Sequence, residues 1–489
     1  MKSSILRTLR GTPACIVFAL CAATAILSPA QGQSFNTLFS FDGTCTSKYA
    51  GANPGFGNLV QGKDGNLYGT TRVCSGNQGT VFKFATTASK PTTLYVFCLK
   101  TGYPCYDGAN PYGGLTLASN GNFYGTTYYG GGVGNYGLVY EITSAGDQNP
   151  VYFFDGTHGS EPNAAPFQAK DGNLYGSTTI GGSSNVGTLY EMTTAGAEAV
   201  SFSFTGGNGE IPYAPLVQGT NGNIYGTTSQ ATSGNGTVFA ILPKTGFAKL
   251  YTFKGAAKGG KPYAGLIQAT NLTFYGTTST GGANLQGGTV FSMTAAGKVT
   301  TIYSFCKKPN CTDGSTPTAS LIQASDGNLY GTTAYGGTNE TSCNGGCGTI
   351  FKITTAGTRT TLYNFCSQSG CTDGNQPAGG LVQATNGTFY GTTYYGGTGG
   401  VGTVFSLSVG LKPFVKILPT WGTAGATAMI LGDNLTGTTK VTFNGVPAAF
   451  TVVSSTEIEA TVPTGATTGT VTVVIPGGTL KSNAIFQVD

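Results

Sequence analysis

One octapeptide recurs along this chain. The letters "DGNLYGTT" occupy residues 64–71, and close variants of them appear at six later places. When the copies are aligned on their tyrosine, they lie 50 to 60 residues apart, at Tyr68, Tyr124, Tyr175, Tyr225, Tyr275, Tyr330 and Tyr390. A fixed period of this length is typical of folds in which each repeat is one supersecondary unit packed against its neighbours. The greater part of the chain must therefore be built from similar units.

Each repeat reads as four short β-strands. A proline is followed by an apolar run such as "GLVQA", a DG or NG turn, "NLYGTT", a glycine-rich loop, "GTIFKIT", a TAG turn and a run such as "TTIYSF". Asp-Gly and Asn-Gly between apolar runs are strong hairpin signals, because both central positions of a type I′ turn need positive φ. One four-stranded sheet per repeat is typical of a propeller blade, and an open solenoid is the competing architecture.

The ends of the repeat region favour the propeller. The last repeat ends with "GTVFSL" at residues 402–407 and lacks its fourth strand, whereas an extra copy of that strand, "NTLFSF", stands at residues 36–41. Pairing the first strand with the last repeat would close a ring and leave no sheet edge unpaired. We therefore predict an all-β fold with a seven-bladed β-propeller over residues 33–411, in which Ser34 to Phe41 complete the seventh blade.

The composition agrees with packed β-structure and argues against some partners. Charged residues make up 9% of the chain, against roughly 25% in an average soluble domain, and glycine fills 80 positions. Hydrophobic residues make up 39%, in short alternating runs, which favours folding over disorder. The formal net charge is only +5, without a basic cluster, so we expect neither nucleic acid nor an anionic membrane as a partner.

Residues 1–32 resemble a secretory signal. Lys2, Arg7 and Arg10 precede the apolar stretch "ACIVFALCAATAIL", and small residues offer cleavage after Ala30 or Gly32. The later sequence contains no stretch apolar enough for a membrane helix. We expect a secreted protein, extracellular, on the cell surface or periplasmic, whose mature chain is a monomer.

The cysteines predict disulfides. Cys15 and Cys21 belong to the signal, which leaves ten, an even number in an exported chain. The close couples are Cys98 with Cys105, Cys306 with Cys311, Cys343 with Cys347 and Cys366 with Cys371, and Cys45 and Cys74 remain for each other. "CNGGC" could be half of a zinc site, but no histidine lies near it in the sequence and no second such pair matches it. We predict no metal and no cofactor.

The repeats carry a family resemblance. The run "LVQGKDGNLYGTT…GTVFKF" and its relatives resemble the GloVer-type tandem repeats of exported bacterial proteins, a resemblance that implies a bacterial origin and little about activity. Residues 412–489, with "GDNL", "VTFNG" and "STEIEATVPTGATTG", are similar to IPT/TIG domains. That resemblance implies an immunoglobulin-like sandwich that serves as a spacer or an interaction module. Four lysines of this tail, Lys412, Lys416, Lys440 and Lys481, do not form the basic loops that DNA binding needs.

The loops between strands contain the candidate binding residues. In a four-stranded blade the glycine-rich loop and the blade-to-blade connection share one face, which carries all the mature cysteines. Aromatic rings and carboxylates on that face could bind a glycan or a surface protein. The predicted ligand-binding residues are Tyr103, Tyr106, Tyr128, Tyr129, Tyr335, Tyr394, Tyr395 and Asp155. The Asp-Gly pairs after the fourth strands are expected to be repeated turns rather than a binding ring.

Catalytic signatures are scarce. The only histidine is His158, and the sequence has no nucleophile elbow beside a serine and no HExxH motif. Glycoside hydrolysis needs two carboxylates, which Asp155, Glu161 and Glu210 could supply, but no spacing selects a pair among them. We predict a non-enzymatic binding protein without catalytic residues. The alternatives are a polysaccharide-degrading enzyme that uses these carboxylates and a purely structural surface protein.

Overall fold

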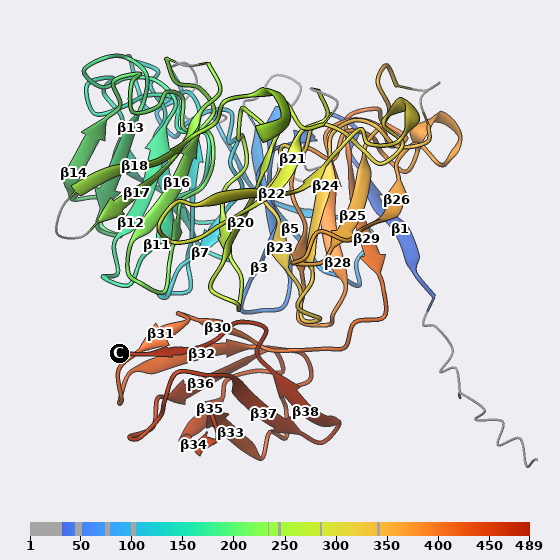
Figure 1. Cartoon of the computed structure of the whole chain (residues 1–489). Helices are drawn as coiled ribbons and strands as arrows, with labels where there is room; N and C mark the ends of the chain where they lie inside the picture. Colours follow the sequence, from blue (N-terminus) through green and yellow to red (C-terminus); the bar gives the residue numbers. More distant parts are fainter. Residues whose placement is uncertain are drawn as a thin grey trace, which may run out of the picture.

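The computed structural model describes residues 32–44, 51–73, 79–98, 104–232, 234–242, 246–283, 286–339 and 343–489. Within these residues the protein consists of β-sheets, loops and three short 3-10 helices, η1 (Ala256–Lys258), η2 (Pro309–Cys311) and η3 (Ser369–Cys371). The predicted all-β class is confirmed. The predicted signal sequence lies outside the described residues. Figure 1 shows the repeat sheets side by side above a smaller C-terminal domain.

Seven sheets lie between Ser34 and Ser408 in these described ranges. The first has the order β2-β4-β5-β6, with β3 also paired to β4. Its strands are β2 (Ala52–Pro54), β3 (Val60–Gln61), β4 (Leu67–Val73), β5 (Thr80–Phe84) and β6 (Thr92–Val96). The second contains β7 (Thr116–Leu117), β8 (Phe123–Thr127), β9 (Leu138–Ile142) and β10 (Gln148–Phe153). The third contains β11 (Phe167–Gln168), β12 (Leu174–Thr178), β13 (Thr188–Met192) and β14 (Glu198–Ser203).

The remaining repeat sheets follow the same antiparallel plan. The fourth contains β15 (Val217–Gln218), β16 (Ile224–Thr228), β17 (Thr237–Leu242) and β18 (Gly246–Thr252). The fifth contains β19 (Ile267–Gln268), β20 (Phe274–Thr278), β21 (Thr289–Met293) and β22 (Val299–Ser304). The sixth contains β23 (Ile322–Gln323), β24 (Leu329–Thr333), β25 (Thr349–Ile353) and β26 (Arg359–Asn364). The last contains β27 (Val382–Gln383), β28 (Phe389–Thr393), β29 (Thr403–Ser408) and β1 (Ser34–Ser40).

The two ends of the repeat region share one sheet. Strand β1 pairs antiparallel with β29, from Ser34 opposite Ser408 to Ser40 opposite Thr403. The buried side chains of Phe41, Phe82 and Tyr390 belong to one apolar cluster, which joins this last sheet to the first. Similar clusters join each of the other sheets to the next one along the chain.

The octapeptide has a local structural explanation in the first repeat. The backbone N–H of Asn66 and the hydroxyl of Tyr68 donate hydrogen bonds to Asp64, at 3.1 and 2.7 Å, so the tyrosine holds its own turn. The strand after the turn is buried along its first five residues. A Cβ on Gly69 would lie 2.8 Å from the ring of Phe82, so this position has no room for a side chain. The repeated letters therefore serve packing and turn formation.

The C-terminal domain packs two four-stranded sheets around one core. The first has the order β30-β32-β36-β35 and the second β34-β33-β37-β38, while β31 and β39 form a short parallel pair. The core includes Val415, Ile430, Val441, Ile458 and Phe486. The strands are β30 (Lys416–Leu418), β31 (Trp421–Gly422), β32 (Thr427–Leu431), β33 (Lys440–Phe443), β34 (Val446–Pro447), β35 (Phe450–Val452), β36 (Glu457–Thr461), β37 (Val471–Ile475), β38 (Gly478–Lys481) and β39 (Gln487–Val488).

A row of glutamines ties neighbouring repeat sheets together at the hairpin-turn end. Each side-chain oxygen accepts a hydrogen bond of 2.8 to 3.0 Å from a backbone N–H of the adjacent sheet. The side-chain amide of each donates to a carbonyl of its own turn. These residues are Gln61, Gln168, Gln218, Gln268, Gln323 and Gln383. In the second sheet the equivalent position is Leu117.

The C-terminal domain contacts the turn end at several sheets, among them the sheet where this glutamine row is interrupted. Leu117 belongs to the same buried cluster as Met429 and Leu431 of β32. Lys63, whose backbone N–H would face a glutamine at position 117, forms a 3.0 Å ion pair with Glu457. The turn end of the repeat region is therefore covered by the C-terminal domain, and the loop end lies opposite it (Figure 1).

Candidate binding site at the loop end

The segment that follows the proline of each repeat surrounds a central pocket. Six side chains from six different sheets line a cavity of about 290 Å³, which we call the mouth: Phe56, Tyr112, Asn163, Tyr213, Tyr263 and Thr318. Five of these side chains also line a second cavity of about 220 Å³, walled by small residues such as Gly113, Ala164 and Ala264. Because the inner residues are small, the centre stays open, while four aromatic rings surround its entrance.

A second layer of side chains comes from the end of the octapeptide strands. Arg72, Tyr128 and Tyr394 occupy the same repeat position, four residues after the repeated tyrosine. The ring of Tyr394 lies 5.4 Å from that of Phe56, and the ring of Tyr128 lies 5.2 Å from that of Tyr112, between centroids. Phe56 and Tyr112 are stacked at 5.5 Å. The last, first and second sheets thus contribute to one aromatic cluster at the mouth.

Two charged groups belong to this cluster. The guanidinium carbon of Arg72 lies 4.6 Å from the ring centroid of Tyr112, and Nη1 donates a 2.7 Å hydrogen bond to the Tyr394 hydroxyl. Burial acts to lower the pKa of Arg72, but the hydrogen bond to Tyr394 and the neighbouring tyrosines raise it overall, so the side chain stays cationic. On the other side, Tyr128 donates a hydrogen bond to Glu161. Burial, and then this carboxylate, raise the pKa of Tyr128.

The backbone at the mouth adopts an uncommon conformation. The residue before each of the seven prolines has φ between 50° and 57°: Asn53, Asn110, Glu161, Ile211, Lys261, Thr316 and Gln376. This left-handed region is uncommon for residues other than glycine and is most strained for a β-branched one. Two of the side chains position the site, because Asn53 donates to the carbonyl of Tyr394 at 2.9 Å and Asn110 donates to that of Arg72 at 3.2 Å.

The structure brings together only part of the predicted tyrosine set. Tyr128 and Tyr394 lie in the mouth cluster. Each is touched edge-on by the ring of the next residue, Tyr129 or Tyr395 respectively, with 4.7 Å between centroids. Tyr335 forms a backbone bridge with Ser315. Within the described ranges, no ring contact or hydrogen bond joins Tyr335 or the 52% exposed Tyr106 to the mouth. Tyr103 lies outside the described residues.

The predicted carboxylates have separate partners. Asp155 lies on an exposed loop and accepts a hydrogen bond of 2.7 Å from the backbone N–H of His158. Its other carboxylate oxygen lies 2.8 Å from Nδ1 of the His158 ring, and this hydrogen bond raises the pKa of His158. Glu161 binds Tyr128 at the mouth. Glu210 lies in a backbone bridge with Gln230. No hydrogen bond joins any two of these three carboxylates in the part of the chain that is described.

The Asp-Gly turns after the fourth strands support loops. Asp313 and Asp373 are fully buried. Each accepts a 2.7 Å hydrogen bond from a tyrosine hydroxyl of its own sheet, Tyr303 and Tyr363, and further bonds from backbone N–H groups. A buried carboxylate that is bonded in this way organises its loop instead of facing a ligand.

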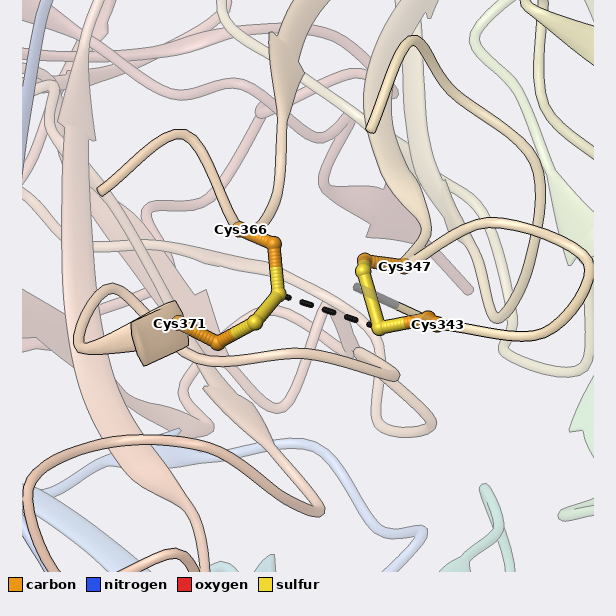
Figure 2. Close-up of side chains that lie close together, drawn as sticks. All are labelled: Cys343, Cys347, Cys366 and Cys371. Carbon is orange, nitrogen blue, oxygen red and sulfur yellow. Dashed lines mark hydrogen bonds between the residues drawn. A yellow bond between two sulfur atoms is a disulfide. The ribbon is translucent and has the colours of Figure 1, made fainter. Parts of the chain in front are cut away.

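Four disulfides fasten loops on the same face. They join Cys98 to Cys105, Cys306 to Cys311, Cys343 to Cys347 and Cys366 to Cys371, as predicted from the spacing. Cys45 and Cys74 lie outside the described residues. Figure 2 shows the last two disulfides side by side, with 3.7 Å between the Sγ atoms of Cys343 and Cys366. The spacing along the chain did not indicate that these two pairs would meet.

These four sulfur atoms lie within 4.8 Å of one another, close enough together for one metal ion. A cysteine ligates metals as a thiolate, whereas here both pairs are oxidised. The cluster is therefore a double cross-link in the oxidised protein.

Sequence reasoning missed the centre of the site. It did not single out Phe56, Tyr112, Tyr213, Tyr263 or Arg72. A signal was present, because these residues occupy two repeat positions at which the side chain varies from repeat to repeat next to well-kept repeat residues. The position four after the repeated tyrosine holds Arg72, Tyr128, Thr179, Ser229, Ser279, Ala334 and Tyr394.

Comparison with protein families agrees with the two-part organisation. A family model described as the Gloeobacter/Verrucomicrobia repeat matches residues 100–287 and 234–447. The chain belongs to this repeat family. A model of the IPT/TIG domain matches residues 414–488, so the C-terminal domain is an IPT/TIG domain. A comparison with curated proteins gave no match.

Solved structures match this repeat-family protein at low identity and with TM-scores below 0.5. PorZ, a surface component of the type-IX secretion system of Porphyromonas gingivalis, is 14% identical with a TM-score of 0.47; the match covers 91% of this chain and 60% of PorZ. A fungal alcohol oxidase of the AA5 family is 11% identical with a TM-score of 0.48, over 91% and 100% of the chains. An oligogalacturonate lyase from Vibrio parahaemolyticus is 10% identical with a TM-score of 0.45, over 77% and 96%. Similarity at this level carries no argument about chemistry.

In the described part of the chain, no helix is long and apolar enough to cross a bilayer.

Proposed function

We propose that this protein is an exported binding protein whose mouth holds a saccharide of an extracellular or cell-surface partner. One observation carries the proposal: rings from four sheets, Phe56, Tyr112, Tyr213 and Tyr263, meet around a single open cavity. Aromatic rings with polar edges bind sugars by stacking on their apolar faces while neighbouring groups accept and donate hydrogen bonds.

The scaffold of this proposal is a seven-bladed propeller closed by β1. The pairing of β1 with β29 and the buried cluster around Phe41 support closure. A closed ring fixes the distances between rings that come from separate repeats, and a binding site needs such preorganisation. The four disulfides support an oxidising compartment outside the cytoplasm.

The non-enzymatic reading is part of the proposal. A glycoside hydrolase needs two carboxyl groups that flank one bond. Asp155, Glu161 and Glu210 bind different partners, and Glu161 alone belongs to the mouth cluster. A single carboxylate that holds a tyrosine suits recognition better than bond cleavage.

The test is a binding and product assay with the mature chain, residues 33–489. A panel of soluble and insoluble polysaccharides is incubated with the protein, and both retained protein and released sugar are measured. We expect retention without product, and we expect Tyr213→Ala together with Tyr263→Ala to lower retention at least tenfold. The matched control is Tyr106→Ala, an exposed ring without a contact to the mouth.

Other outcomes decide between the alternatives. Retention that survives the paired tyrosine replacement would place binding elsewhere and contradict the proposed site. A new reducing end or an unsaturated product would establish a polysaccharide-degrading enzyme. If the protein neither retains nor cleaves any polymer, the remaining alternative is a purely structural surface protein.

A further inference from the structure

Arg72 is the exception in its repeat position. The equivalent residues in the other repeats are neutral, namely Tyr128, Thr179, Ser229, Ser279, Ala334 and Tyr394. The octapeptide strand is otherwise uniform, so one repeat places a cation where six place a small polar, apolar or aromatic group. The first sheet thereby places a positive charge at one point of the mouth, which the repeat alone would not provide.

The guanidinium group is held in place but has no carboxylate partner. Its carbon lies over the ring of Tyr112 at 4.6 Å, and Nη1 is bound to Tyr394 at 2.7 Å. Its Nε is buried and has no hydrogen-bond partner, and none of the ion pairs among the described residues includes Arg72. The buried Nε cannot reach a ligand, but among the described hydrogen bonds of this side chain only Nη1 takes part, so the remaining Nη hydrogens of the fixed guanidinium can donate to an anion.

A second stacked arginine shows what is particular to Arg72. Arg359 lies within 5.4 to 5.7 Å of the rings of Tyr303, Phe305 and Phe351, and its Nε also lacks a partner. Burial lowers the pKa of Arg359, whereas the surroundings of Arg72 raise its pKa. Arg359 packs between sheets. Arg72 instead lies over Tyr112, a ring that lines the open cavity, so its charge can act on a ligand held there.

The site has a polarity across the mouth. Arg72 lies over the ring of Tyr112, whereas Glu161 is separated from that ring by Tyr128, which contacts Tyr112 and donates a hydrogen bond to Glu161. An anionic group of a ligand is attracted to Arg72 and repelled by Glu161. Phe56 is 39% exposed and stacks on Tyr112, the ring that Arg72 also contacts, so its exposed surface can hold the sugar that bears the anion.

From this geometry we infer that the mouth selects saccharides that carry a carboxylate, that is, uronic acid residues, and that Arg72 binds the carboxylate. The inference rests on the proposed saccharide-binding function and names the substrate class for that site. A uronate presents its carboxylate at the edge of a sugar ring, so one residue can stack on Phe56 while its acid group reaches the guanidinium.

The experiment compares free acids with neutral versions of the same chains. Oligomers of galacturonate, glucuronate and mannuronate, each with its fully methyl-esterified counterpart, are titrated into the mature protein by calorimetry at fixed ionic strength. We expect at least one free acid to bind ten times or more tighter than its ester. Arg72→Gln should lower the affinity for the free acid at least tenfold and so abolish this preference, and Arg72→Lys should restore part of it.

The matched control removes a cation away from the mouth. Lys440→Gln, at an exposed position of the C-terminal domain, changes the net charge equally and should leave the preference intact. If Arg72→Gln does not fold, Tyr394→Phe removes the hydrogen bond that orients Nη1 and should weaken the preference severalfold.

The outcomes separate the two proposals. Esters or neutral sugars that bind as well as the acids would overturn the inference and leave saccharide binding at the mouth standing. An acid preference that survives Arg72→Gln would overturn the assignment to Arg72. Absence of binding by every oligomer and polymer would overturn both proposals together.

Discussion

The two ends of the repeat region differ in how much they vary. At the turn end, each glutamine of the row makes the same pair of hydrogen bonds. In each turn, an Asp or Asn side chain accepts a hydrogen bond from the backbone N–H two residues later. At the loop end, the aligned positions hold Phe56, Tyr112, Asn163, Tyr213, Tyr263, Thr318 and Ala378. The comparison shows that the fold is maintained at one end and that chemical variety is allowed at the other.

The physical reason lies in what each end must satisfy. Turn-end groups range from exposed, as at Asp64 and Asp171, to buried, as at Gln61 and Gln383. Where they are buried, an unpaired N–H or carbonyl costs roughly 1–3 kcal/mol. A change of residue there would leave such groups without partners. Side chains at the mouth face an open cavity, so their replacement alters what can bind and leaves the ladder of hydrogen bonds intact.

The largest expected effect comes from removing β1, on which both ends depend. Deletion of residues 33–41 leaves β29 with an open edge and exposes the cluster around Phe41. We expect loss of a single cooperative thermal transition and a tendency to associate. A milder version is Phe41→Ala, which should lower the free energy of unfolding by about 3–5 kcal/mol, since this ring is fully buried.

The matched control for Phe41→Ala is Phe153→Ala, because Phe153 is 46% exposed and its loss should cost less than ~1 kcal/mol. Calorimetry and size-exclusion chromatography provide the readouts. A deletion variant that remains monomeric and unfolds as cooperatively as the full mature chain would show that the ring does not depend on β1.

The next largest effect concerns stability at the turn end, which the C-terminal domain covers. Lys416 of β30 lines a cavity of about 500 Å³ between the domains, beside Val217, Ile267 and Val382. Burial lowers its pKa from 10.5 to about 8. Since the folded-state pKa lies below the ordinary value, the charged form opposes folding. Stability should therefore rise as the pH increases from about 8 toward 10.5.

Lys416→Met should stabilise the protein at pH 7 by about 1–2 kcal/mol, less than the full pKa shift would give because the side chain keeps some exposure. The variant should also lose the rise in stability above pH 8, as measured by chemical unfolding at several pH values. Lys440→Met, on an exposed lysine of the same domain, should do neither. An equal pH dependence in Lys416→Met and the parent protein would disprove this account of the covered end.

The smallest effect tests strain at the mouth. Ile211 is β-branched and has φ of 55°, whereas Asn53 and Asn110 occupy the same repeat position. Asparagine tolerates this conformation better, so Ile211→Asn should raise the free energy of unfolding by about 1 kcal/mol. The reciprocal change, Asn110→Ile, should destabilise the protein and weaken binding, because Asn110 holds the carbonyl of Arg72. A destabilised Ile211→Asn would mean that the left-handed residues carry no strain.

The sequence predicted what is local and repeated. The hairpin turns, the all-β class and the close cysteine couples follow from residues that are near one another in the chain. The meeting of Arg72 with Tyr394, or of Phe56 with Tyr112, depends on how separate repeats are arranged around one centre. The pairing of Lys63 with Glu457 likewise joins residues that no local pattern connects. Such contacts are set by long-range packing, so individual letters do not reveal them.

The interrupted glutamine row has a consequence for symmetry. Near-identical sheets offer the C-terminal domain nearly equivalent docking positions, one at each sheet. Leu117 breaks this equivalence, because in place of a hydrogen-bonded glutamine it joins the buried apolar cluster that includes Met429 and Leu431. Together with the chain connection after β29, one irregular repeat thus favours a single rotational setting of the appended domain relative to the Arg72 side of the mouth.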